Sequence, residues 1–180
     1  MMSVLILVLL GAAATAIIML LRGSMEHPSN LPELLDRLEP FNAACFRHLA
    51  SDVDNGYLKQ KLPTREYRRL RLLRLSAIRA YYALAFHNSS LLLSYGQVLV
   101  RASDADLVEF GQQLSTAAIQ LRLALIKGAV GVFCCYFLPV GVPYCRQITE
   151  HYDRIGAHLK ALCDMHAPDL GITVAEHFSF

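Results

Sequence analysis

Positively charged side chains are concentrated in one stretch of the chain. Eight cations lie between residues 59 and 79, where Glu66 is the single acidic residue, so the stretch carries a local charge of +7 against +2 for the whole chain. In a helix that turns about 100° per residue, four of the arginines share one side and two widen the arc. The candidate contact residues are Arg65, Arg68, Arg69 and Arg79, widened by Arg71 and Arg74.

Such a stripe of arginines has three kinds of partner. It can meet anionic lipid headgroups, where each cation contributes about 1 kcal/mol, or acidic residues of a protein partner, or the phosphates of nucleic acid. A solvated face, whose long stems shield the helix, is the alternative without a partner. Because the chain lacks a nucleic-acid-reading motif and a strongly basic overall balance, we expect a membrane or an acidic partner and no nucleic acid.

Cysteine and histidine recur in two pairs with the same spacing. Cys45-x-x-His48 and Cys163-x-x-His166 each place a thiol and an imidazole one helical turn apart, and together they match a Cys2His2 zinc set. In an up-and-down bundle, however, both pairs sit at the C-terminal ends of antiparallel helices, at opposite ends of the bundle. We therefore expect no shared metal ion and no cofactor.

A polar cluster near the C-terminus has the residue types for acid–base chemistry. It consists of Glu150, His151, Asp153, Arg154 and His158. Nothing marks a nucleophile beside it, so a solvated helix face explains it as well. The chain also lacks the Glu-x-x-His pairs of di-iron proteins, a glycine-rich phosphate loop, a G-x-S-x-G elbow and an H-E-x-x-H motif. We expect no catalysis.

The N-terminus predicts a membrane anchor. Residues 4–21 contain no charge and end at Arg22, and a helix of that length spans about 27 Å, enough for a bilayer core. No cation precedes the run, which argues against a cleaved signal peptide. The cations that follow it place the N-terminus outside and the main domain in the cytoplasm. Gly11 and Thr15 form a small-xxx-small pair that suggests a homo-oligomer contact.

The remainder predicts a helical domain. The chain is 54% hydrophobic and 18% charged, which excludes disorder, and its odd number of five cysteines excludes a fully paired disulfide framework. We divide it into an anchor (1–22), a linker (23–30), a helical bundle (31–171) and a short extended tail (172–180). The predicted fold class is all-α, an N-terminal transmembrane helix followed by an antiparallel bundle built on a long helical hairpin.

Apolar periodicity and capping residues set the expected helix boundaries. A helix capped by Asn30 runs from about 31 to 49 and is kinked or restarted at Pro40, and residues 52–56 form a turn before a short segment, 57–62. Thr64 caps a long helix to about residue 100, with Leu73 on its apolar face. Ser103 and Asp106 form a capping box for its antiparallel neighbour, and a last helix covers about 144–165.

A second apolar run leaves two membrane topologies open. Residues 128–145 contain no charge, and fourteen cations lie from Arg22 to Lys127 against three beyond. This asymmetry fits a second span at about 123–145, whereas Pro139 and Pro143 favour a core helix that ends in a buried connection. The first hypothesis is therefore a single-span scaffold or interaction protein. The alternative is a two-span protein that encloses a small ligand or ion site near His87 and Asn88.

Overall fold

The structure is a computed structural model that describes residues 28–137 and 145–166, except the side chains of residues 52–55, 136, 137, 145 and 166. The predicted anchor, the Gly11–Thr15 pair, most of the linker and the tail lie outside the described residues. Every element in the described ranges is a helix, which confirms the all-α prediction: α2 (Leu31–Arg37), α3 (Ala43–Leu49), α4 (Asp52–Lys61), α5 (Thr64–Leu99), α6 (Ala105–Phe137) and α7 (Cys145–His166).

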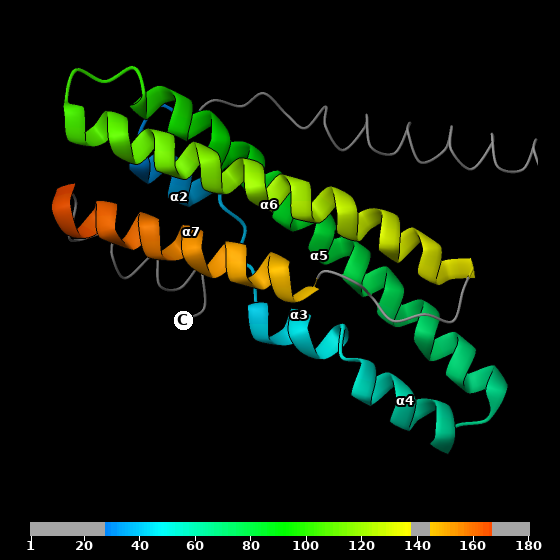
Figure 1. Ribbon diagram of the computed structural model, residues 1–180. Helices are drawn as coiled ribbons and strands as arrows, with labels where there is room; N and C mark the ends of the chain where they lie inside the picture. Colours follow the sequence, from blue (N-terminus) through cyan, green and yellow to red (C-terminus); the bar gives the residue numbers. More distant parts are fainter. Residues whose placement is uncertain (1–27, 138–144, 167–180) are drawn as a thin grey trace, which may run out of the picture.

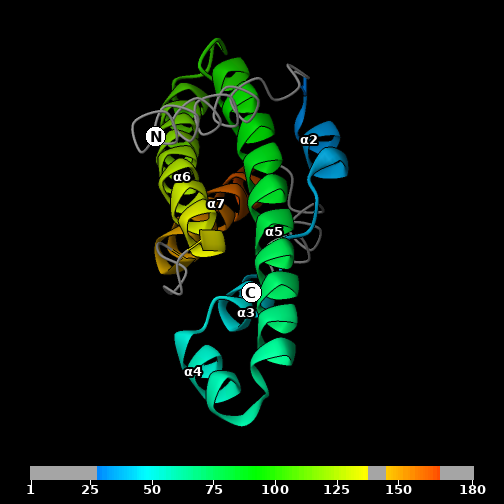
Figure 2. The same ribbon diagram turned by 90° about the vertical axis from the view of Figure 1, so that its right-hand side faces the viewer.

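The long hairpin dominates the molecule. Helices α5 and α6 run antiparallel side by side, joined by residues 100–104, as predicted (Figure 1). Helix α7 packs against α6 and α3, and the short helices α2, α3 and α4 lie along α5. Figure 2 shows α5 and α6 next to each other with α7 behind them. The core therefore lies on the side of the hairpin that α7 and the short helices cover.

Glycines allow the two long helices to approach closely. A Cβ atom at Gly111 would lie 2.8 Å from the carbonyl oxygen of Gly96, and one at Gly128 would overlap the ring of Tyr82. At Gly111 the missing side chain lets the two helix backbones approach closely, and at Gly128 it makes room for the Tyr82 ring. The hairpin is thus fixed in register at two heights.

A buried polar clamp joins three parts of the chain. The side chain of Asn88 on α5 is fully buried. Its Oδ1 accepts a hydrogen bond from the backbone N–H of Glu39 (3.1 Å), and its Nδ2 donates to the Glu39 carbonyl (2.6 Å) and to the hydroxyl of Tyr152 on α7. Next to it, the ring of Phe41 stacks on Tyr152 with centroids 4.2 Å apart. The α2–α3 connection is therefore held against both α5 and α7.

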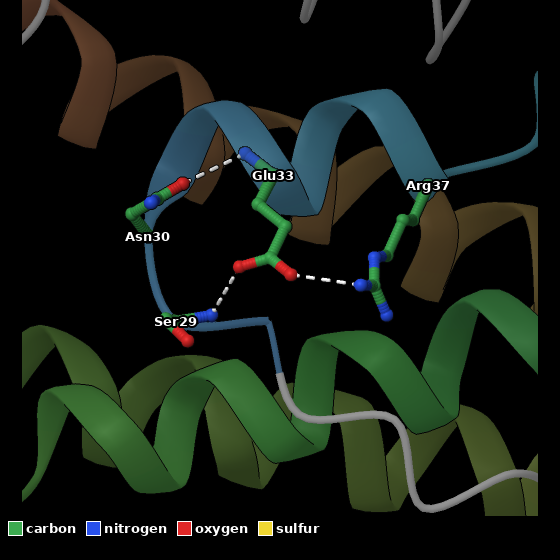
Figure 3. Close-up of polar contacts among 4 residues, drawn as sticks. All are labelled: Ser29, Asn30, Glu33 and Arg37. Carbon is green, nitrogen blue, oxygen red and sulfur yellow. Dashed lines mark hydrogen bonds and ion pairs between the residues drawn. The ribbon is translucent and has the colours of Figure 1, made fainter.

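Helix α2 begins with the cap that the sequence predicts. Asn30 Oδ1 accepts from the Glu33 backbone N–H (2.9 Å), while the Glu33 carboxylate accepts from the Ser29 N–H (2.8 Å) and pairs with Arg37 (Figure 3). These contacts satisfy two backbone donors at the helix start. After Pro40 the chain restarts as α3, with Asn42 as its cap (2.8 Å to the Cys45 N–H).

Three predicted local features are wrong. Residues 52–56 form the first half of α4 rather than a turn: the two aspartates lie in its first turn, where the helix dipole favours them, and a helical glycine costs only about 1 kcal/mol. Thr64 lies inside α5, and Pro63 takes the cap position. At α6, Asp104 rather than Ser103 accepts the backbone N–H of Asp106.

One described helix is long and apolar enough to cross a membrane. It covers Ala105–Cys135, and 39% of its most apolar eighteen-residue window is buried. The predicted second span, at about 123–145, overlaps the C-terminal part of this helix, and residues 138–144 lie outside the described ranges.

Candidate basic surface

The exposed side of α5 carries four of the six candidate arginines. Arg65, Arg68, Arg69 and Arg79 are exposed, and within the described part of the chain none of them makes a hydrogen bond or an ion pair. They share one side of the helix because their spacings are close to whole turns. Their charges are thus available to a partner.

Two leucines lie on the same side. Leu72 is 52% exposed and Leu73 is 60% exposed, and both sit between Arg69 and Arg79. The prediction that Leu73 belongs to the apolar face of the helix is wrong, because the core lies against the opposite side of α5. We call the set of Arg65, Arg68, Arg69, Leu72, Leu73 and Arg79 the basic face. The spacing of these six positions in the sequence already predicts that they share one side of a helix, since they fall within one arc.

The other two arginines hold the fold together. Arg74 lies on the opposite side of α5, where its guanidinium donates to the carbonyls of Leu49 (2.9 Å), Ser51 (3.2 Å) and His48 (3.3 Å). Two of these carbonyls end α3 and the third, that of Ser51, follows it; carbonyls at a helix C-terminus lack partners inside the helix and attract a cation. Arg71 donates to the backbone carbonyl of Cys135 on α6.

The acidic residues of the hairpin lie only near the ends of its helices. None occurs between Glu66 and Asp104, and none between Glu109 and Glu150. These two helices carry eight cations and three carboxylates, and the cations of the central stretches, among them Arg122 and Lys127, have no acidic neighbour in sequence on their own helix. The hairpin presents a positive potential to its surroundings.

The outward side of α6 is apolar in its C-terminal half. Ile119 (48% exposed), Leu123 (52%), Val130 (43%) and Phe133 (38%) follow one another at steps of three, four or seven residues, with the half-buried Ile126 between them. We call these five residues the apolar line of α6. We treat this run of exposed large side chains as a candidate contact surface.

The two Cys–His pairs are separated in the structure. Cys45 contacts Tyr81, and this hydrogen bond, together with burial, raises the pKa of that phenol. Cys163 lies near Tyr95, whose pKa is raised mainly by burial. Tyr95 follows Tyr81 by fourteen positions along α5, which is a rise of about 21 Å. No group of three metal-ligating side chains occurs among the described residues, and the His166 side chain lies outside them.

The polar cluster on α7 borders a shallow groove. Arg154 and His158 face the glutamines of α6 across a space of about 450 Å³, and Arg154 Nη1 lies 3.4 Å from Gln120 Oε1. Glu150 pairs with Arg146 (2.7 Å). Seven of the eight groove residues are polar, the eighth is the buried Ala117, and the one hydroxyl among them, that of Thr116, donates to a carbonyl of its own helix.

Comparison with family models finds no match for the chain. Comparison with curated proteins and with solved structures finds none either. A proposal about function therefore rests on the surface chemistry of the hairpin.

Proposed function

We propose that the protein is a membrane-anchored helical scaffold without catalytic activity, whose basic face lies on anionic lipid headgroups. The observation that carries this proposal is the combination of four arginines without a partner among the described residues and two exposed leucines on one side of α5. Residues 4–21 serve as the anchor, and the helical body lies on the cytoplasmic side.

The combination favours lipid over an acidic protein. Cations near an anionic membrane surface contribute about 1 kcal/mol each, and full burial of a leucine contributes about 1.5–3 kcal/mol. A helix side with both cations and large apolar residues is typical of helices that lie in the membrane interface. The anchor keeps this side close to the bilayer, so a modest affinity is sufficient.

The chain contains no tryptophan, so a single introduced tryptophan reports on the basic face. We place it at the exposed Ser76, between Leu73 and Arg79, in the full-length protein in nanodiscs. Phosphatidylglycerol added to phosphatidylcholine discs should shift the Ser76→Trp emission to shorter wavelength and make it quenchable by brominated acyl chains. Ala157→Trp, on the exposed side of α7, should respond to neither change.

Two variants with the same net charge distinguish binding through the basic face from general electrostatic attraction between the protein and anionic lipid. Replacing Arg65, Arg68, Arg69 and Arg79 by Gln should abolish the response to phosphatidylglycerol. Replacing the exposed cations Arg47, Arg101, Arg146 and Lys160 by Gln changes the net charge equally and should preserve it. An emission of Ser76→Trp that is the same in both lipid mixtures would refute the proposal.

The apolar length of α6 favours a second candidate, a two-span protein in which this helix crosses the bilayer. Its support is the Ala105–Cys135 stretch, of which less than half is buried in the most apolar window. Arg122 and Lys127 lie within that stretch, and a cation at the centre of a span costs about 2.5–3.5 kcal/mol. Asn88 has its amide fully engaged with Glu39 and Tyr152. We therefore rank this candidate second.

A further inference from the structure

We propose that the seam between α5 and α6 binds the phosphate of a phospholipid headgroup through Arg122, while the apolar line of α6 contacts the acyl chains. The inference rests on the proposed function, because it adds a defined headgroup site to the membrane-facing side of the hairpin.

The guanidinium of Arg122 bridges the two helices. It lies 4.9 Å from the centroid of the Phe86 ring, and its Nη2 donates to Ser90 Oγ (2.6 Å). Its Nε is buried and has no hydrogen-bond acceptor among the described residues. The ring and the hydroxyl hold the guanidinium in place but leave part of its donor capacity unused.

No carboxylate lies close to Arg122 in the sequence of α6, and none lies on the part of α5 that Arg122 contacts. The acidic residues closest to Arg122 along the chain are Glu109 and Glu150, and α5 has none after Glu66. A partly desolvated cation without a counter-charge is costly, and an anion with two oxygens matches the planar fork of arginine. The site therefore favours a phosphate or a carboxylate from outside the described chain.

The surroundings of Arg122 select a lipid as the source of this anion. Ile119 and Ile126 lie three residues before and four residues after it, so they flank it on the same helix side. A ligand bound there therefore meets the exposed Ile119 and the half-buried Ile126 as well as the cation. A phospholipid supplies both the phosphate and the apolar chains, whereas free phosphate supplies only the first.

The apolar line and the basic face lie at overlapping positions along the axis of the hairpin. Tyr82 lies against Gly128, and Arg71 reaches the carbonyl of Cys135. Because the helices are antiparallel, Arg79 and Leu72 then lie at about the height of Val130 and Phe133. Figure 2 shows α7 behind α5 and α6, so α7 does not cover the near side of the hairpin. A bilayer that contacts the basic face is thus within reach of Arg122.

The test uses the full-length protein in maltoside micelles, which contain no phosphate. Leu123→Trp reports binding of short-chain phosphatidylglycerol below its micellar concentration, with inorganic phosphate as the second probe. We expect saturable binding of the lipid and much weaker binding of inorganic phosphate. Arg122→Lys keeps the charge but removes the bidentate fork, and should weaken lipid binding about tenfold. Arg122→Gln should weaken it further.

Two controls make each outcome decisive. Arg101→Lys, at an exposed cation of the α5–α6 connection, should bind the lipid as the parent protein does, and thermal unfolding should show that Arg122→Lys remains folded. Lipid binding unchanged in both Arg122 variants would overturn the site, and inorganic phosphate binding as tightly as the lipid would overturn the lipid as ligand. Arg122→Gln should leave the phosphatidylglycerol response of Ser76→Trp intact, so failure of this site differs from failure of the basic face.

Discussion

The arginines of α5 have two roles, one in holding the fold together and one in facing solvent. Single substitutions can test these roles separately. Arg74 donates to three backbone carbonyls at the end of α3, whereas Arg69 extends into solvent. Removing a charged donor from three partly buried or exposed acceptors costs about 1–3 kcal/mol, whereas surface substitutions change stability by only about 0.5 kcal/mol. Arg74→Gln should therefore lower the free energy of unfolding by about 1–3 kcal/mol, measured by chemical denaturation.

Arg69→Gln provides the control for this prediction. It should leave the free energy of unfolding unchanged and reduce the lipid response of Ser76→Trp. Equal stability of the Arg74 and Arg69 variants would contradict the division of roles. The helical positions in the sequence place these two arginines on different sides, but they do not reveal that the end of α3 packs under Arg74. Only the tertiary arrangement shows it.

A histidine on α7 gives the protein a pH-dependent stability. His151 is partly buried, and its Nδ1 has no hydrogen-bond partner among the described residues. Burial lowers the pKa of His151, the nearby Arg154 lowers it further, and Glu150 opposes the shift. Between that lowered pKa and the unfolded value of about 6.5, the unfolded chain binds more protons than the folded one. Stability is therefore highest above about pH 6.5 and falls as the pH drops through this window.

His151→Gln should remove this contribution. Melting temperatures recorded between pH 7.5 and pH 5 should fall less steeply for the variant than for the parent protein. His48→Gln, at an exposed histidine on α3, should keep the parent slope. If both variants follow the parent curve, burial of His151 does not govern the pH dependence.

The close approach of α5 and α6 makes a prediction for the hairpin. A Cβ at Gly111 would lie 2.8 Å from the Gly96 carbonyl oxygen, 2.8 Å from Leu99 Cβ and 2.8 Å from the Val100 nitrogen. Two of these neighbours are backbone atoms, so a helix must shift, and such overpacking costs about 1–3 kcal/mol. Gly111→Ala should destabilise the protein despite the higher helix propensity of alanine.

Gly56→Ala is the matched substitution in α4. A Cβ there would meet nothing within 4 Å, so propensity alone decides and the variant should gain up to about 1 kcal/mol. Opposite signs for the two glycine variants, measured by denaturant unfolding, are the expected result. A stabilised Gly111→Ala would show that the helices are farther apart than described.

The sequence predicts the long helices better than their connections. Apolar periodicity over thirty or more residues indicates the two long helices, and the capping signals at Thr64 and Ser103 place the starts of α5 and α6 within one or two residues. The Asp–Asn–Gly sequence at residues 54–56 is compatible both with a loop turn and with the start of a helix. The packing of α4 on α5 decides between these two structures. The cap at Asp104 instead of Ser103 shows the same limit, because adjacent residues have similar capping ability.

At the scale of the molecule, charge and exposure indicate a single side for contact with a membrane. The acidic residues lie outside the central stretches of α5 and α6, and the exposed apolar residues of the hairpin lie among its cations. The arginine cluster was predictable because it is local in sequence. The apolar line was not, because an apolar helix such as α6 is expected to be buried until its neighbours are known to cover only one side.

The topology of the chain tests the central claim most directly. One protease-cleavable tag is inserted in the linker at residue 25 and another follows Phe180, in full-length protein in sealed vesicles of known sidedness. A helical body that lies on the membrane surface after a single span predicts cleavage of both tags from the cytoplasmic side. A linker tag that is cleaved while the C-terminal tag is protected would mean that α6 crosses the bilayer, and would contradict the account.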